Sequence, residues 1–138
     1  VEVKAWRVES GARVHISQPS QIGVDPHRLL HLAAVQISVG GPAGRALRET
    51  VALLRARMSA MQAQRFEELL AEYGFLEAQA DDYRDRMLVL GLDVYDVREG
   101  FPHVDVRSIP GGVAELRYVI ELGALESFRS SNRHLSQP

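Results

Sequence analysis

The stretch L-L-H-L-A-A-V-Q-I-S-V, residues 29–39, decides the fold class of this chain. It is a near-continuous apolar run that ends at the turn formers Gly40-Gly41-Pro42. Such a run predicts a central strand that is buried on both faces, as in the sheets of α/β proteins. Partner strands are therefore expected on both sides of residues 29–39.

Two shorter strands are predicted before this run. Residues 1–6 and 12–17 both alternate, and Glu9-Ser10-Gly11 supplies a turn between them, so together they predict a β-hairpin. On the first strand Glu2, Lys4 and Trp6 share one face. Residues 17–22 then predict a short helix start with Pro19 in its first turn, capped by Ser17 or Ser20 and interrupted by Gly23 and Pro26.

Helical periodicity follows residue 44. Apolar residues recur at spacings of 4, 3, 4 and 3, at Leu47, Val51, Leu54, Met58 and Met61. A second helix over 62–73 should stop at Gly74, and one continuous helix is the alternative. Beyond it the pattern predicts strands over 86–97 and 115–122, a loop over 101–112 and a short helix over 124–128. The result is an α/β chain with a helical pair between two sets of strands.

The composition is that of a globular protein. The chain has 138 residues, 46% of them hydrophobic and 25% charged, which suits one domain or part of one. No run approaches the roughly 18 apolar residues that a membrane span needs. Cysteine is absent, which excludes disulfides and thiolate metal sites and fits a cytoplasmic protein. With a net charge of −2, any nucleic-acid surface must be a local patch.

Glu2 and Lys4 form the constellation with the clearest chemistry. They point the same way from one strand, with Cα atoms roughly 6–7 Å apart. A carboxylate binds a hard cation such as Mg²⁺, and an ammonium beside it can orient an attacking water or stabilise charge on phosphorus oxygens. Lys4 is the only lysine beside 15 arginines. Because one carboxylate is too few, we expect a second acid, typically Asp, from a strand that would precede Val1.

The order of motifs resembles a known family. E-V-K resembles the (D/E)-x-K half of the PD-(D/E)XK nuclease motif, and the wider layout is similar to a family of bacterial PD-(D/E)XK-motif proteins associated with restriction and phage defence. The matching segments are V-H-I-S-Q-P-S-Q-I, the run 29–39, F-P-H-V, I-P-G-G-V, L-R-Y-V-I-E-L and A-L-E-S-F-R. The similarity spans nearly all of residues 1 to 129.

This resemblance implies a restriction-endonuclease-like mixed sheet, present in part, with an inserted helical pair and a C-terminal β extension. It implies the C-terminal half of the nuclease core in residues 1–44, a helical region in 45–85, C-terminal strands and a short helix in 86–129, and a flexible tail in 130–138. Glu2 would be the metal ligand, Lys4 the catalytic lysine and Gln21 an auxiliary site residue. The cofactor would be Mg²⁺ or Mn²⁺ and the substrate DNA, with defence-complex proteins or a second copy of the chain as partners.

Other signals carry less weight. Arg45, Arg48 and Arg55 share one predicted helical face and could contact DNA phosphates, although a solvated face is the common outcome. His27 and His31 have a zinc spacing only if they are helical, whereas the surrounding residues predict a loop that enters a strand. G-G-P-A-G-R (40–45) lacks the ending of a phosphate loop, which favours strand-to-helix punctuation.

Two alternatives to a nuclease remain open at this level. The chain could be a nuclease-like domain that has lost catalysis and serves as a docking or DNA-binding module of a multisubunit complex. It could also be a plain α/β interaction domain in which E-V-K is a coincidence, with Glu2 and Lys4 forming an ordinary charge pair on a solvated strand face. Placement of Glu2 and Lys4 on opposite sides of the sheet, or away from any hollow, would exclude the nuclease.

Overall fold

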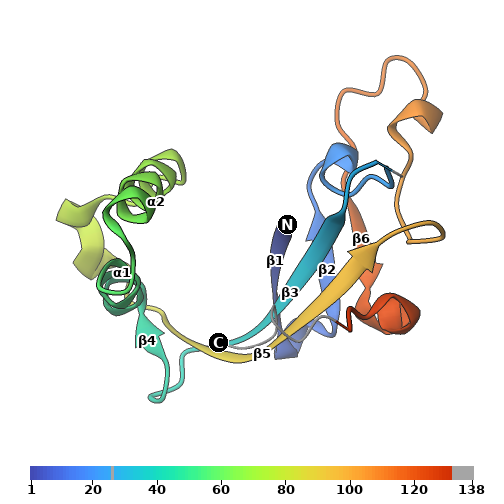
Figure 1. The fold of residues 1–138 in the computed structure, drawn as a ribbon. Helices are drawn as coiled ribbons and strands as arrows, with labels where there is room; N and C mark the ends of the chain where they lie inside the picture. The colour runs from blue at the N-terminus through green and yellow to red at the C-terminus, as the bar shows by residue number, and fades with distance from the viewer. Residues whose placement is uncertain (26, 132–138) are drawn as a thin grey trace. The chain divides into compact units, whose positions relative to one another are not determined.

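The computed structural model describes residues 1–25 and 27–131 (Figure 1). Pro26 and most of the predicted tail, 132–138, lie outside the described residues. The chain divides into two compact units, one formed by Val1–Ile37 with the segment from Val89 onward, and one formed by Ser38–Leu88. Because the second unit interrupts the first in sequence, it is an insertion into the unit that carries Glu2 and Lys4.

The predicted central strand is β3, Leu30–Val39. It lies between β1 (Glu2–Arg7) and β5 (Arg86–Val97) in a sheet of order β1-β3-β5-β4, with β4 at Arg45–Ala46. β1 runs parallel to β3 and β4 runs antiparallel to β5, so the predicted α/β class with a mixed sheet is confirmed. Burial on both faces of β3 is limited to the consecutive residues Leu32, Ala33 and Ala34.

The predicted hairpin between residues 1–6 and 12–17 is wrong. β2 (Arg13–Ile16) pairs antiparallel with β6 (Tyr118–Glu121), and β1 pairs with β3. The connection is a 3₁₀ helix, Val8–Ser10, followed by Gly11 at φ 78°. This 3₁₀ turn does not reverse the chain onto β1. Instead, β2 buries Val14 and Ile16 beside Ile120 of β6.

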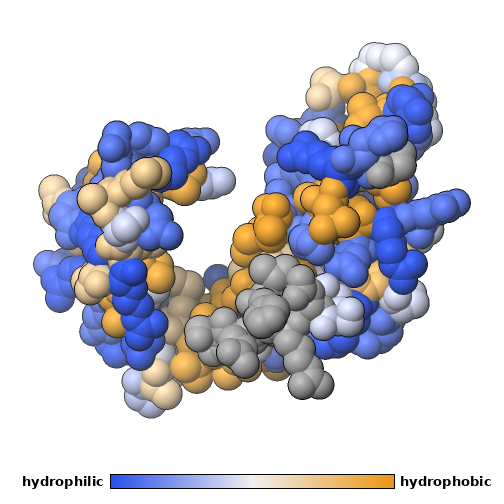
Figure 2. All heavy atoms as spheres, in the orientation of Figure 1, coloured by the Kyte–Doolittle hydropathy of each residue, from blue (hydrophilic) through white to orange (hydrophobic). Residues whose placement is uncertain are grey.

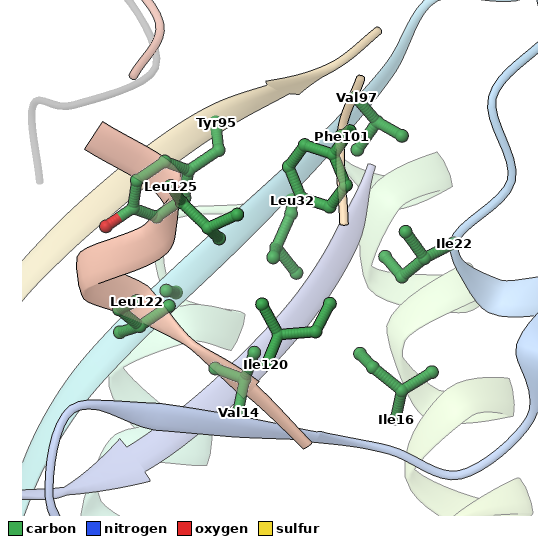
Figure 3. Packing of buried hydrophobic residues seen from close by; sticks show 11 residues of the cluster. Val14, Ile16, Ile22, Leu32, Tyr95, Val97, Phe101, Ile120, Leu122 and Leu125 are labelled. Carbon is green, nitrogen blue, oxygen red and sulfur yellow. The ribbon is translucent and has the colours of Figure 1, made fainter. Parts of the chain in front are cut away.

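The core of the first unit lies on one face of β3 (Figure 3). Figure 3 shows Leu32 surrounded by side chains from β2, β5, β6 and the 3₁₀ helix Leu122–Phe128. The largest fully buried members are Tyr95, Phe101, Ile16, Ile22, Leu32, Leu125 and Val14. Phe101 meets Phe128 edge to face with ring centroids 5.2 Å apart. This packing fixes the face of the sheet toward which Leu32 and Ala34 point.

The second unit carries two separate helices, α1 (Leu47–Arg55) and α2 (Ala60–Glu72), so the single-helix alternative is wrong. Ser59 begins α2, because its hydroxyl accepts a hydrogen bond from the Gln62 backbone while the Gln62 side chain accepts one from the Ser59 backbone. α2 ends before Gly74, as predicted, and Gly74 has a left-handed conformation with φ at 79°. A 3₁₀ helix, Glu77–Asp82, then leads back to β5.

Gly44 shows why residues 40–45 form a glycine-rich turn. A Cβ atom at this position would lie 2.9 Å from backbone atoms of Arg86 and Met87. The Gly44 carbonyl also accepts a hydrogen bond of 2.8 Å from the Arg86 side chain. The glycine-rich segment therefore brings β4 against β5, as expected for a turn between elements.

The C-terminal elements follow the prediction closely. The 101–112 loop contains one 3₁₀ turn, Val106–Ser108. β6 falls within the predicted strand 115–122, and the predicted short helix is the 3₁₀ helix that begins at Leu122. Leu122 and Leu125 both reach the core, which explains why this polar-flanked segment is ordered.

Candidate functional site

β1 places Glu2 and Lys4 on the same face of the sheet. Glu2 is opposite Leu32 and Lys4 is opposite Ala34 on β3, and those two residues are 0% and 1% exposed. Val3, between them, points to the other face and is 60% exposed. The alternation of β1 is as predicted, but the covered face is the one that carries the polar side chains. Glu2 and Lys4 thus lie beside the core of the first unit.

The two charged groups contact each other directly. Lys4 Nζ lies 2.9 Å from Glu2 Oε1, and the two side chains are only 16% and 25% exposed. Partial burial lowers the local dielectric, so each charge acts more strongly on its neighbour than in an exposed pair. The carboxylate and the ammonium therefore form a partly buried ion pair.

Gln21 is the third member of this group. It ends the 3₁₀ helix Pro19–Gln21, whose N-cap is Gln18 rather than the predicted Ser17 or Ser20. Its Oε1 accepts hydrogen bonds from Lys4 Nζ at 3.1 Å and from the backbone N–H groups of Ser17 at 3.1 Å and Gln18 at 3.3 Å. The two backbone donors fix the Gln21 oxygen, and that oxygen holds the ammonium. We name Glu2, Lys4 and Gln21 the Glu2–Lys4–Gln21 cluster.

A hollow of about 370 Å³ opens beside this cluster. The polar side chains that line it are those of Glu2, Ser20, Gln21, Asp25 and Arg28, and Val1, Gly23, Val24 and Leu30 complete the lining. Sequence reasoning missed Asp25 and Arg28, because D-P-H-R carries only the signature of a turn. The hollow lies entirely within the first unit.

Two of the side chains that line the hollow carry carboxylates of the kind that bind divalent cations. Carboxylates such as those of Glu2 and Asp25 are the ligands that Mg²⁺ prefers. The Asp25 carboxylate also accepts a hydrogen bond of 2.8 Å from the His27 backbone. Within residues 1–25 and 27–131, however, no three His, Asp or Glu side chains form a group that could hold a metal. Glu2 and Asp25 would therefore need ligands from beyond the described residues to hold a metal ion.

The three arginines predicted to contact DNA lie in the second unit. Arg45 is in β4, not on the helix that carries Arg48 and Arg55, so the expectation of one shared helical face is wrong. Arg48 pairs with Asp81, and Arg55 pairs with Glu67 at 2.7 Å and Glu77 at 2.9 Å. The Arg55 guanidinium lowers the pKa of Glu67 by donating hydrogen bonds to it. Figure 2 shows a largely hydrophilic surface on this unit. The carboxylates bound to Arg48 and Arg55 compensate the positive charge of these two side chains.

The two histidines at zinc spacing do not come together as ligands. His27 is in an exposed loop, whereas His31 lies on β3, facing away from the neighbouring core residue Leu32. His31 Nδ1 is 3.0 Å from Asp96 Oδ1 of β5. Trp6 shares the Glu2 and Lys4 face and packs against the core, with its indole N–H buried without a hydrogen-bond partner.

A family model described as "Putative PD-(D/E)XK family member, (DUF4420)" matches residues 1–123. The chain belongs to this family. No curated protein and no solved structure matches it. Within the matched residues, Glu2-Val3-Lys4 has the residue types and spacing of the (D/E)-x-K half of the motif that gives the superfamily its name.

Family membership confirms the resemblance to the PD-(D/E)XK superfamily. It suggests a nuclease with DNA as its substrate, and such nucleases typically use divalent metal ions. No helix among the described residues is both long and apolar enough to cross a bilayer.

Proposed function

We propose that this chain is the C-terminal part of a Mg²⁺-dependent DNA endonuclease of the cytoplasm that acts in restriction or phage defence. The observation that carries the proposal is the Lys4 ammonium, held between the Glu2 carboxylate and the Gln21 amide oxygen beside a hollow. An ion pair on a solvated strand face would have neither the third partner nor the partial burial.

Each member of the cluster has a distinct role in this proposal. Glu2 is a ligand for Mg²⁺ or Mn²⁺, and the bound ion supplies a more acidic water and stabilises charge on the phosphate. Lys4 orients the attacking water and stabilises negative charge that develops on the phosphoryl oxygens. Gln21 positions Lys4 through its backbone-anchored oxygen. Hydrolysis joins the water oxygen to phosphorus, breaks the bond to the leaving sugar oxygen and protonates that oxygen.

We further propose that the second carboxylate is an Asp on a strand beyond β1. Among the described residues β1 is the last strand on its side of the sheet, so its outer edge is available for pairing. A strand added there would lie next to Glu2. Because the described residues provide too few ligands, we expect residues 1–138 alone to cleave DNA poorly.

Cleavage of duplex DNA by the full-length protein in Mg²⁺ tests this proposal. We expect Glu2→Gln and Lys4→Arg each to lower the single-turnover rate by about 100-fold or more, because each removes charge or geometry used in the transition state. Glu9→Gln, an exposed carboxylate on the adjoining 3₁₀ helix, is the matched control and should cut at the wild-type rate.

Two results would contradict the proposal. If Glu2→Gln and Lys4→Arg both cut like the wild type, the catalytic assignment is wrong. If the wild type binds DNA but cuts none in Mg²⁺ or Mn²⁺, the non-catalytic docking module is the better description. The defence role is tested separately by phage plating on cells that express the wild type or Lys4→Arg, where only the wild type should reduce plaque formation.

A further inference from the structure

We infer that Arg28 anchors the DNA backbone at the mouth of the Glu2–Lys4–Gln21 cluster by binding a phosphate. This inference rests on the proposed function and extends it to a substrate contact that neither the motif nor the sequence pattern identifies. Arg28 lines the same 370 Å³ hollow as Glu2 and Gln21. Among the residues that line the hollow it is the only one with a positively charged side chain.

The Arg28 guanidinium is available for a ligand. Many other arginines of the described segments, such as Arg48, Arg55 and Arg129, contact a carboxylate. Within residues 1–25 and 27–131 the Arg28 side chain makes no hydrogen bond or ion pair, although Asp25 lies three residues before it. Arg28 is exposed at the hollow, so its donors face solvent.

The loop holds the Arg28 backbone in the wall. The backbone N–H of Arg28 donates a hydrogen bond of 3.2 Å to the Asp25 carbonyl, and the two residues form an isolated β-bridge. The Asp25 side chain is bound to the His27 backbone instead of to the guanidinium. As a result the loop presents a carboxylate and an unpaired guanidinium at one opening.

A phosphate is the ligand that these features favour. A guanidinium is a planar fork of donors that matches two phosphate oxygens, and it keeps its charge at any physiological pH. Glu2 and Asp25 would repel a small free anion, whereas a DNA strand that contacts the protein at further points can place one phosphate on Arg28. The larger hollow of about 440 Å³ beside residues 17–19 and 113–117 lacks this feature, because its Arg117 is already paired with Glu115.

The salt dependence of DNA binding tests the inference. The full-length protein is titrated with a labelled DNA duplex in Ca²⁺, which replaces Mg²⁺ to suppress cleavage, over a series of salt concentrations. Arg28→Gln should weaken binding by about three- to tenfold and reduce the slope of log K against log salt by about one, since one phosphate contact is lost. Arg28→Lys should restore the slope.

Arg7→Gln is the matched control. Arg7 is also exposed and without an ion pair among the described residues, but it lies at the far end of β1 and on the face opposite Glu2 and Lys4. If Arg28→Gln and Arg7→Gln give the wild-type slope while the wild type cleaves DNA, the inference about Arg28 is overturned and the proposed function stands. If the wild type neither binds nor cleaves DNA, both are overturned.

Discussion

Replacing Gln21 with Met separates the role of this side chain from that of a generic surface glutamine. Met has a similar length but cannot accept the three hydrogen bonds that converge on Gln21 Oε1. The bond from the partly buried Lys4 ammonium is charge-assisted and contributes about 1.5 kcal/mol or somewhat more. The two backbone donors, at Ser17 and Gln18, are exposed and can bind water instead, so they add only about 0.5 kcal/mol together.

The expected loss is therefore about 2 kcal/mol in the free energy of unfolding, or roughly 4–8 °C in Tm. Urea denaturation followed by the fluorescence of Trp6 measures it, because Trp6 is the only tryptophan and packs against the core of the same unit. Gln64→Met is the control, since Gln64 is exposed on α2 and its change should leave stability within about 0.5 kcal/mol.

The same variant should slow DNA cleavage by about 10- to 100-fold, because the Lys4 ammonium loses the acceptor that fixes its position. Gln21→Glu keeps an oxygen at this place and should retain the stability of the wild type. If Gln21→Met unfolds at the wild-type urea concentration and cuts at the wild-type rate, Gln21 does not position Lys4 and has no part in the site.

Three further changes test the fold. Leu32→Ala should cost about 2–5 kcal/mol by opening a cavity in a fully buried site, and an unchanged urea midpoint would contradict the core described here. Gly44→Ala should cost about 1–3 kcal/mol because its Cβ meets the backbone of β5, whereas Gly41→Ala has open space and should cost little. Burial raises the pKa of Tyr95, so the free energy of unfolding should fall as pH rises from about 10 through that higher pKa. In Tyr95→Phe the free energy of unfolding should fall less steeply over the same pH range. Equal alkaline unfolding of the two proteins would show that the Tyr95 hydroxyl is hydrated in the folded protein.

The sequence predicts the elements whose pattern is local. The apolar run of β3 and the spacing of α1 identify a strand and a helix because burial dictates their period. Strand pairing is different, since it depends on partners that are far apart in sequence. β2 pairs with β6 across about a hundred residues, and nothing in residues 12–17 specifies that partner. The predicted hairpin rests on proximity in sequence, but the 3₁₀ helix Val8–Ser10 between the two strands leads β2 away from β1 as a pairing partner.

In the candidate site, too, the sequence predicts the features set by a local pattern and not those set by contacts between distant segments. Glu2 and Lys4 were predicted to point in one direction because alternation along a strand requires it, and they do. The contact between Gln21 and Lys4 depends on a turn seventeen residues later, so no periodic pattern in the sequence indicates it. Asp25 and Arg28 have no periodic signal, and the ion pairs of Arg48 and Arg55 depend on acids from other elements. A single sequence does not specify which side chains from different helices, strands and loops will contact each other.

The most direct test of the central claim uses Lys4. In the full-length protein labelled with ¹³C at lysine Cε, the Lys4 signal is assigned by its loss in Lys4→Arg, and Mn²⁺ broadens signals near the place where it binds. A divalent ion held by Glu2 should broaden the Lys4 signal at low Mn²⁺, and Glu2→Gln should abolish the effect. A Lys4 signal that stays sharp at saturating Mn²⁺, or that broadens equally in Glu2→Gln, would contradict a metal site at the Glu2–Lys4–Gln21 cluster.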